Sequence, residues 1–257
     1  MILLQTSASI MSDSKHTPKQ IGFSTGALER GNYRAALNWL RNNNVHNVEL
    51  SALRLEELEP LVADLDSLQT QWFSYVSFHA PSSFPEEAES RVVDLLQRVV
   101  KRGWNIIVHP DVIRKPELWR KFGRSLLLEN MDRRKSVART ADELAKWFVA
   151  LPEARLCLDV AHARQLDTTM ILLTDILEKF QDRLGELHIS ELDSHCRHQP
   201  MSASSVADYK RFAANLSPGL PVIIEAMLDG ARTGQRIEEL RLAQKATEPE
   251  SADVQFD

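Results

Sequence analysis

Short runs of apolar and β-branched residues alternate along most of the chain with longer amphipathic segments. Segments 91–102, 142–151, 168–180 and 206–216 place apolar residues at helical spacing. The shorter runs have the length and composition of buried strands. These runs occupy residues 21–25, 46–51, 72–78, 104–108, 124–129, 154–159, 184–190 and 220–225.

Eight strands that alternate with helices predict an α/β protein with a parallel sheet covered by helices. At 257 residues, eight such units favour a single (β/α)8 TIM barrel, and an open doubly wound sheet is the alternative. No GxGxxG phosphate fingerprint follows the first strand. We expect the barrel at residues 21–245, a disordered lead-in at 1–20 and an acidic tail at 246–257. Translation could start at Met1 or Met11, and Thr140 with Glu143 resembles a helix capping box.

The predicted strands end repeatedly in a residue that can bind a metal ion. In a parallel barrel all strand ends of one kind lie on one face, which carries the active site in such barrels. Six of the eight histidines lie at or just after these ends. The strand-end residues are His79, His109, Glu129, Asp159, His188 and Glu225, and His162 follows Asp159 by three positions.

Alternation along the strands supports this placement, because side chains of neighbouring residues point to opposite faces. If Glu129 points into the barrel, Leu126 and Leu128 point outward to the helices. The same holds for Ile106 and Val108 beside His109, and for Val222 and Ile224 beside Glu225.

Each of these residues, taken singly, also has an ordinary structural interpretation as a hydrogen-bonded or ion-paired side chain. Together, in one mouth, carboxylates and imidazoles would repel or stay unsatisfied unless protons or cations bridged them. Mixed histidine and carboxylate ligands suit divalent zinc, manganese, iron or cobalt. The set exceeds the ligands of a single catalytic ion, so we expect two or three ions per chain, with one as the alternative and zinc or manganese favoured.

The ordered motifs HAP, VHP, LEN, LDxxHA, LHIS and IEA resemble the xylose isomerase-like TIM barrel superfamily over residues 21–245. The pattern is most similar to the endonuclease IV branch, which implies a multinuclear zinc site. An Asp-x-His pair follows the seventh strand in that branch. Here either His198 matches its histidine, with Cys196 in place of the aspartate, or Asp193 and His195 form the pair. The implied metal ligands are His79, His109, Glu129, Asp159, His162, His188, His198 and Glu225.

The sugar isomerase and epimerase branch of the superfamily is also similar, through a smaller set. It implies one metal ion held by residues matching Glu129, Asp159, His188 and Glu225, with the two glutamates moving a proton beside a carbonyl. Histidines at 79 and 109 are not needed there, so their presence favours the multinuclear arrangement. In either case Glu129 and Glu225 are the candidate catalytic residues.

Charge and composition limit the classes of molecule that we expect the protein to bind. The net charge is −5, which predicts no general attraction to nucleic acid or to acidic membranes. No stretch is long and apolar enough to span a membrane, and two distant cysteines fit a cytoplasmic protein. Bases that follow strand ends, among them Arg133, Arg134 and Arg197, predict a small anionic substrate. Alternatively, some of these bases pair with Asp111, Asp132 or Asp229.

The sequence therefore favours a metal-dependent hydrolase of a small anionic substrate such as a phosphate ester. A sugar or keto-acid isomerase or epimerase with one metal ion is the first alternative. An endonuclease of the AP type that acts on DNA is the second, and a barrel that binds without catalysis is the third. Substrate identity and oligomeric state do not follow from the pattern.

Overall fold

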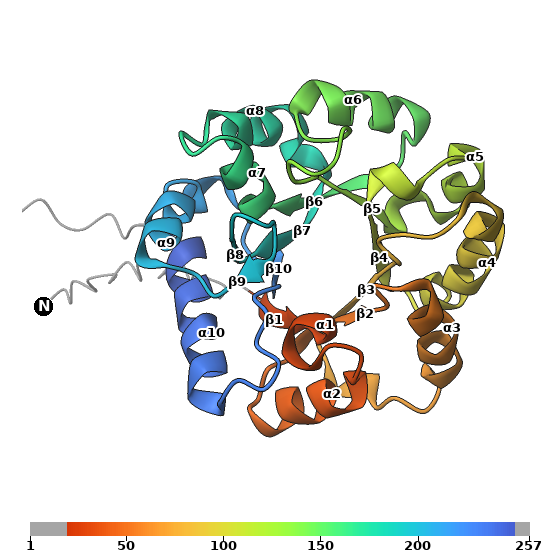
Figure 1. The fold of residues 1–257 in the computed structure, drawn as a ribbon, viewed down its shortest axis with the longest axis horizontal. Helices are drawn as coiled ribbons and strands as arrows, with labels where there is room; N and C mark the ends of the chain where they lie inside the picture. Colours follow the sequence, from red (N-terminus) through yellow and green to blue (C-terminus); the bar gives the residue numbers. More distant parts are fainter. Residues whose placement is uncertain (1–19, 250–257) are drawn as a thin grey trace, which may run out of the picture.

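A computed structural model describes residues 20–249 and shows eight parallel strands closed into a barrel (Figure 1). The order around the barrel is β1-β10-β7-β6-β5-β4-β3-β2, so the first and last strands pair and the open-sheet alternative is excluded. The strands are β1 (Gln20–Ser24), β2 (Asn47–Ser51), β3 (Tyr75–His79), β4 (Asn105–Val108), β5 (Leu126–Glu129), β6 (Arg155–Asp159), β7 (Leu184–Ile189) and β10 (Pro221–Ile224).

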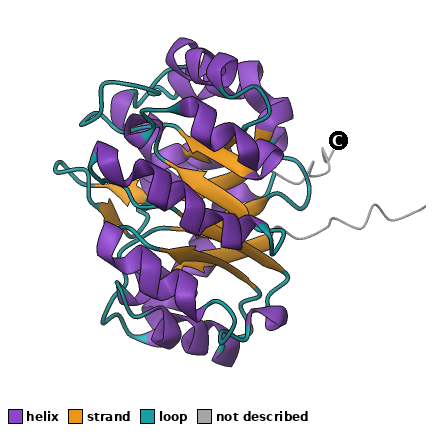
Figure 2. Cartoon of the chain, turned by 90° about the vertical axis from the view of Figure 1, so that its right-hand side faces the viewer, coloured by secondary structure: helices purple, strands orange, loops and turns teal. Residues whose placement is uncertain are grey.

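Helices form a layer around the outside of this barrel (Figure 2). The α-helices are α1 (Thr25–Glu29), α2 (Tyr33–Asn42), α3 (Leu55–Asp64), α4 (Glu89–Val100), α5 (Pro116–Trp119), α6 (Ala141–Ala150), α7 (Val160–Leu166), α8 (Ile171–Phe180), α9 (Ala203–Lys210) and α10 (Thr233–Thr247). Short 3-10 turns are η1 (Thr70–Trp72), η2 (Glu86–Ala88), η3 (Pro110–Val112), η4 (Arg120–Ser125), η5 (Gln181–Arg183) and η6 (Ala213–Asn215).

All eight predicted strands are confirmed, but the third and the fifth begin later than predicted, the fifth at Leu126 after η4 rather than at Arg124. Residues Thr70–Trp72 form the turn η1, so β3 begins at Tyr75 rather than at Trp72. In this turn the Trp72 ring stacks on His46, with 4.1 Å between centroids. The four helical segments are confirmed as α4, α6, α8 and α9, the last ending at Lys210 before η6.

Half of the predicted capping box of α6 is present. The Thr140 hydroxyl accepts a hydrogen bond from the Glu143 backbone N–H at 3.2 Å. The Glu143 carboxylate accepts from the Arg139 N–H at 2.8 Å instead of from the Thr140 N–H. It also pairs with the Arg139 guanidinium, which explains why it turns one residue further back.

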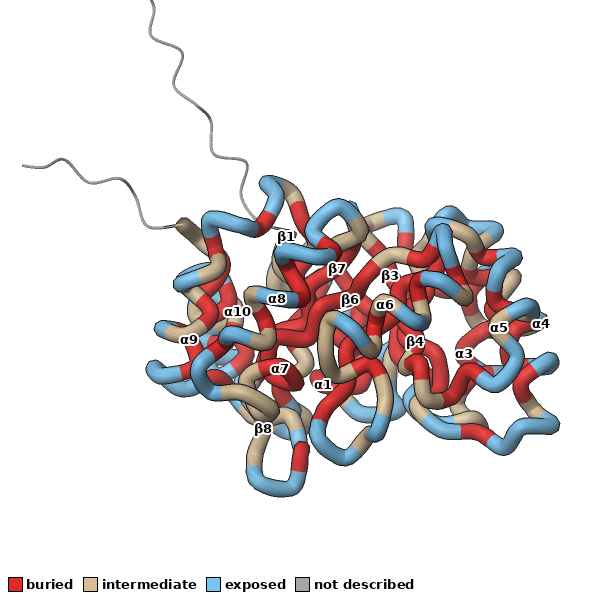
Figure 3. The backbone as a smooth tube through the Cα atoms, turned by 90° about the horizontal axis from the view of Figure 1, so that it is seen from above, coloured by how far each residue is buried: buried red, intermediate tan, exposed pale blue. Residues whose placement is uncertain are grey.

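The barrel wall separates two apolar clusters, as the predicted alternation requires. Most buried apolar residues pack between strands and helices, and Figure 3 shows how buried segments follow the strands. Inside the barrel lies a separate small cluster of Ile107, Leu127 and Cys157. The residues predicted to face outward, which are Ile106, Val108, Leu126, Leu128, Val222 and Ile224, all belong to the outer cluster.

One glycine in the barrel wall is required by close packing. A Cβ atom on Gly22 in β1 would lie 2.0 Å from the Asn47 carbonyl oxygen of β2. No side chain fits there without moving backbone.

The predicted segment boundaries lie at the edges of the described residues. β1 begins at Gln20 and α10 ends at Thr247, within two residues of the predicted limits of the barrel. The remainder of the predicted lead-in and acidic tail, 1–19 and 250–257, lies outside the described residues. Within residues 20–249, no helix has the length and apolar character that crossing a membrane requires.

Candidate metal centre

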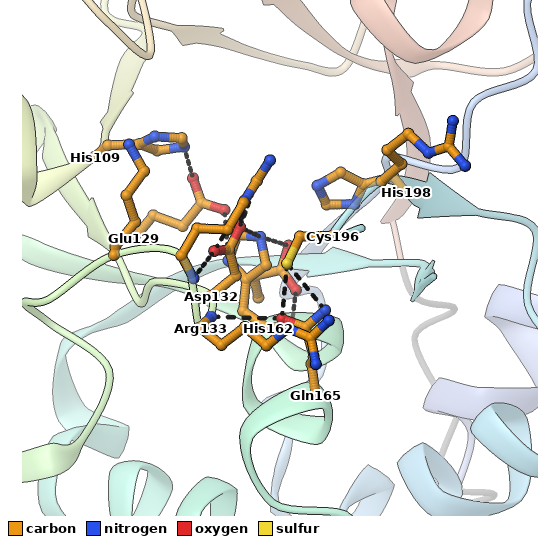
Figure 4. A network of polar contacts seen from close by, with 12 residues as sticks. His109, Glu129, Asp132, Arg133, His162, Gln165, Cys196 and His198 are labelled. Atoms are coloured by element: carbon orange, nitrogen blue, oxygen red, sulfur yellow. Dashed lines mark hydrogen bonds and ion pairs between the residues drawn. The ribbon is translucent and has the colours of Figure 1, made fainter. Parts of the chain in front are cut away.

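Histidine and carboxylate side chains meet at the C-terminal mouth of the barrel, where β3 to β7 and β10 end. Figure 4 shows part of this cluster, with His109, Glu129, His162 and His198 reaching toward one region from different elements. Glu129, Asp159 and His188 are almost fully buried, whereas Glu225 keeps a small exposed surface. The eight predicted ligands therefore converge, and they form three overlapping groups in which the ligand atoms lie within 4.8 Å of one another.

The first group joins β3, β4 and β5. The Oε2 atom of Glu129 lies 3.2 Å from His79 Nε2 and 3.2 Å from His109 Nε2. His79 is oriented by its other ring nitrogen, Nδ1, which lies 2.7 Å from the Ala80 carbonyl oxygen. That contact fixes Nε2 as the nitrogen that faces Glu129.

The second group consists of Glu129, Asp159, His188 and Glu225. His188 Nδ1 lies 3.3 Å from Glu225 Oε2 and 3.6 Å from Glu129 Oε1. Asp159 is held in place because its backbone N–H donates to Asn130 Oδ1 at 2.7 Å. Glu129 thus belongs to two groups, one through each carboxylate oxygen.

The third group contains Asp159, His162 and His198. His162 stands in the first turn of α7, where its backbone N–H donates to Asp159 Oδ1 at 2.8 Å. Its Nδ1 lies 2.8 Å from the Asn130 carbonyl oxygen, so Nε2 faces Asp159 Oδ2 at 3.6 Å. Asp159 therefore connects the second and third groups, as Glu129 connects the first and second.

Several buried ligand atoms in this cluster have no hydrogen-bond partner, and this observation tests whether metal ions fit. These atoms are Asp159 Oδ2, His162 Nε2 and His188 Nδ1. A buried polar atom without a partner destabilises a protein by about 1–3 kcal/mol. Three such atoms in one cluster of imidazoles and carboxylates suit divalent cations, which such ligands bind.

Burial and mutual charge shift the pKa values of the cluster strongly. Burial raises the pKa of Asp159 to about 7 and lowers that of His198 to about 4. Burial alone would lower the pKa of His79, but its hydrogen bond to Glu129 and nearby carboxylate charges raise it to about 9. Protons and metal ions therefore compete for the same atoms, as is usual in metal sites.

The loop after β7 folds back as a two-stranded hairpin, β8 (Glu191–Leu192) with β9 (His198–Gln199). This hairpin returns His198 to the mouth. Asp193 accepts hydrogen bonds from the backbone of His195 and Arg197 instead of facing the cluster. Cys196 Sγ lies 3.3 Å from the Gln165 side chain (Figure 4). Among the described residues, His198 is in a ligand group and Asp193, His195 and Cys196 are not.

A cavity of about 1030 Å³ opens above the cluster. It is lined by the ligands His79, His109, Glu129, His162, His198 and Glu225, by Cys196, and by the apolar side chains of Leu53 and Met227. Five bases also line it, which are Arg30, Arg54, Arg134, Lys135 and Arg197. Of the three predicted substrate-binding arginines, Arg134 and Arg197 thus reach the cavity, whereas Arg133 donates to the Ser194 carbonyl oxygen.

Each base at the cavity pairs with a carboxylate, as the alternative interpretation of these bases predicted. Arg134 Nε lies 2.9 Å from Asp132 Oδ2, and Lys135 Nζ lies 2.5 Å from Asp111 Oδ2. The other three pairs are Arg30 with Asp229, Arg54 with Glu57 and Arg197 with Asp193. The partner carboxylates do not line the cavity. Its carboxylates are Glu129 and Glu225 of the cluster, and the rest of its charged lining consists of the five bases.

Sequence reasoning missed the buried glutamates beneath the mouth and the two bases Arg30 and Arg54. Glu49 and Glu186 are fully buried inside the barrel. The signal for Glu186 was present, because it stands two residues before His188 and therefore points to the same side of β7. Arg30 and Arg54 follow the first two strands, where no ligand-type residue directed attention to the loops.

No protein-family model and no curated protein matches the sequence. Solved structures do match. Endonuclease IV from Thermus thermophilus matches with a TM-score of 0.59 and 16% identity over 88% of this chain and 98% of the other. The 3-keto-D-glucoside 4-epimerase from E. coli matches with a TM-score of 0.55 and 17% identity over 88% and 99%. An uncharacterized protein from Parabacteroides distasonis matches with a TM-score of 0.55, 14% identity and coverage of 88% and 98%. These similarities, together with the closed barrel of eight parallel strands, confirm the TIM barrel fold that the sequence pattern predicted.

Proposed function

We propose that the protein is a metal-dependent hydrolase of a small anionic substrate, such as a phosphate ester, with two or three zinc or manganese ions. The observation that carries this proposal is the sharing of Glu129 between two ligand groups. A carboxylate that faces two ligand groups, one oxygen to each, is what a site for neighbouring ions requires. A site for one ion would leave His79 and His109 without a use.

When bound, the ions would supply Lewis acidity toward water and toward a phosphoryl or carbonyl oxygen. His79, His109 and Glu129 would hold one ion, and Glu129, Asp159, His188 and Glu225 would hold the next. His162 and His198 would hold a third ion together with Asp159. Glu225 reaches the cavity and keeps 11% of its side chain exposed, so it can accept a proton from a reacting group.

The bases of the cavity bind the anionic group of the substrate in this proposal. Arg134 is fixed by both carboxylate oxygens of Asp132, which leaves the rest of its guanidinium exposed toward the mouth. The Arg197 guanidinium is held by Asp193 through a single oxygen, Oδ2, which Nε and Nη2 both contact. Charge-assisted hydrogen bonds from such held guanidinium groups suit phosphate and carboxylate oxygens.

A one-metal isomerase or epimerase is the second candidate, favoured by the second ligand group. Glu129, Asp159, His188 and Glu225 form a complete set of ligands without the other histidines. Glu129 and Glu225 both lie close to Nδ1 of His188, at 3.6 and 3.3 Å, so the two candidate proton-transferring carboxylates are near each other. A structure with a similar fold is that of a 3-keto-D-glucoside 4-epimerase.

Turnover assays on metal-loaded protein separate these candidates. We expect hydrolysis of small phosphate esters, lost with a chelator and restored by zinc or manganese. Deuterium uptake into sugars or keto acids, without hydrolysis, would instead favour the isomerase. Cleavage of duplex DNA at an abasic site, with no turnover of small esters, would contradict the small substrate.

A further inference from the structure

A column of buried polar side chains lies inside the barrel, directly beneath the metal centre. It contains Glu49, Ser77, Glu186 and His188, all with no exposed surface. His188 stands at the top of the column, and its two ring nitrogens have different surroundings. Nδ1 faces the ligands Glu129 and Glu225, whereas Nε2 faces downward to Glu49 and Glu186.

Glu186 is fixed from below by donors on neighbouring strands. Its Oε1 accepts a hydrogen bond from Ser77 Oγ at 3.1 Å, and its Oε2 accepts one from the Tyr75 hydroxyl. The Tyr75 oxygen in turn accepts from Asn105 Nδ2 at 3.0 Å. Arg155 donates to Asn105 Oδ1 at 2.6 Å and completes this chain. The carboxylate of Glu186 therefore has one defined orientation beneath His188.

The two glutamates beneath His188 are not equivalent, although both lie close to it. Glu186 Oε1 lies 3.2 Å from His188 Nε2 with the geometry of a hydrogen bond. Glu49 Oε2 also lies 3.2 Å from Nε2 but has no hydrogen-bond partner. Of these two contacts, the one to Glu186 has the geometry of a hydrogen bond, so an N–H on Nε2 would point to Glu186 rather than to Glu49.

We infer that Glu186 is a positioning residue, which accepts the Nε2–H of His188 and leaves Nδ1 as the metal-binding nitrogen. A neutral imidazole carries one N–H, so an acceptor at one nitrogen fixes the free lone pair at the other. Carboxylates that hold metal-binding histidines in this way also raise their basicity. The inference rests on the metal centre of the proposed function, but not on hydrolysis.

The first test is the protonation pattern of His188 in the wild-type protein. We expect 15N NMR of the zinc-loaded protein to show His188 protonated at Nε2 and bound through Nδ1. A His188 that carries its proton on Nδ1 and binds zinc through Nε2 would overturn the inference. This measurement uses the wild-type protein, so it does not depend on whether a variant folds.

The second test compares zinc affinities, measured by competition with a chromophoric chelator. We expect E186A to weaken the binding of one ion by about 10- to 100-fold, and E186Q to weaken it less because the amide oxygen still accepts the N–H. E49Q changes a glutamate that lies at the same distance from His188 Nε2 but makes no hydrogen bond to it. We therefore expect E49Q to lose less zinc affinity than E186A. E89Q is the matched control, because Glu89 is fully buried outside the barrel and accepts hydrogen bonds from Arg114, Lys115 and Trp119.

The outcomes distinguish the inference from the proposed function. Equal zinc affinity in E186A and E89Q would overturn the positioning role and leave the hydrolase proposal standing. The expected affinities without any hydrolysis would overturn the hydrolase and leave the positioning role. A wild-type protein that binds no zinc would overturn both.

Discussion

The Nε2 atom of His109 lies 3.2 Å from Oε2 of Glu129, which joins the end of β4 to the carboxylate at the end of β5. The same oxygen contacts His79, and the other oxygen of Glu129 faces His188 at 3.6 Å. Glu129 thus stands between two ligand groups, and its removal should affect both.

The first prediction concerns metal content per chain, measured by elemental mass spectrometry on protein purified without chelators or an affinity tag. We expect two or three ions in the wild type, about one fewer in His109→Ala, and at least two fewer in Glu129→Ala. His195→Ala is the control, because His195 is exposed and belongs to no ligand group. One ion, lost in Glu129→Ala and kept in His109→Ala, would favour the isomerase.

The second prediction compares two neighbouring arginines whose side chains point in different directions. Arg134 lines the cavity, whereas Arg133 turns to the Ser194 carbonyl. We expect Arg134→Met to weaken the binding of inorganic phosphate about tenfold, since a charged hydrogen bond contributes about 1.5–3 kcal/mol. Isothermal titration calorimetry measures the dissociation constant for inorganic phosphate. The expected change in Arg133→Met is less than about twofold, and equal losses in both variants would argue against a directed anion site.

The third prediction is a pH dependence of stability caused by Glu239 on α10. Burial raises the pKa of this carboxyl to about 7, so the folded state binds its proton more tightly than the unfolded chain. The resulting stability is present below about pH 4.5 and is lost as the pH rises through about 7. We expect Glu239→Gln to remove this loss and to be more stable than wild type at pH 8, on the order of 1–3 kcal/mol.

Urea unfolding at pH 5 and at pH 8 measures this difference. Glutamine retains an oxygen that can accept from the Met201 N–H, as Glu239 does, so the comparison isolates the charge. The prediction would be contradicted if the free energies of unfolding of wild type and Glu239→Gln differed by the same amount at both pH values.

The fourth prediction tests the closeness of β1 and β2. Gly22→Ala would place a Cβ atom 2.0 Å from the Asn47 carbonyl oxygen, and we expect it to destabilise the fold on the order of 3 kcal/mol. Gly234→Ala is the matched control, since nothing lies within 4 Å of its added Cβ in α10. Helix propensity favours alanine there by up to about 1 kcal/mol. Thermal unfolding of both variants measures these changes in stability. An unchanged stability of Gly22→Ala would contradict so close an approach of β1 and β2.

Much of the fold could be predicted because the strands carry a local signal. Alternation placed Leu126 and Leu128 against the helices and Glu129 inside, and the structure has the same arrangement. The convergence of the strand-end residues followed from parallel strands alone. The third strand was predicted too long: Trp72 belongs to η1, where its ring stacks on His46, a contact between segments that the local pattern does not contain.

The sequence by itself determined the eight strands, their inward and outward faces and the ligand types at their ends, because these depend on neighbouring residues along the chain. Only the tertiary structure decided the closure of the barrel, the placement of His198 rather than His195 beside Asp159 and His162, and the different directions of Arg133 and Arg134. It also placed Glu186 under His188, held by Tyr75 and Ser77 of another strand. These features depend on contacts between residues far apart in sequence, and such contacts exist only once β1 pairs with β10 and the strands enclose a common interior.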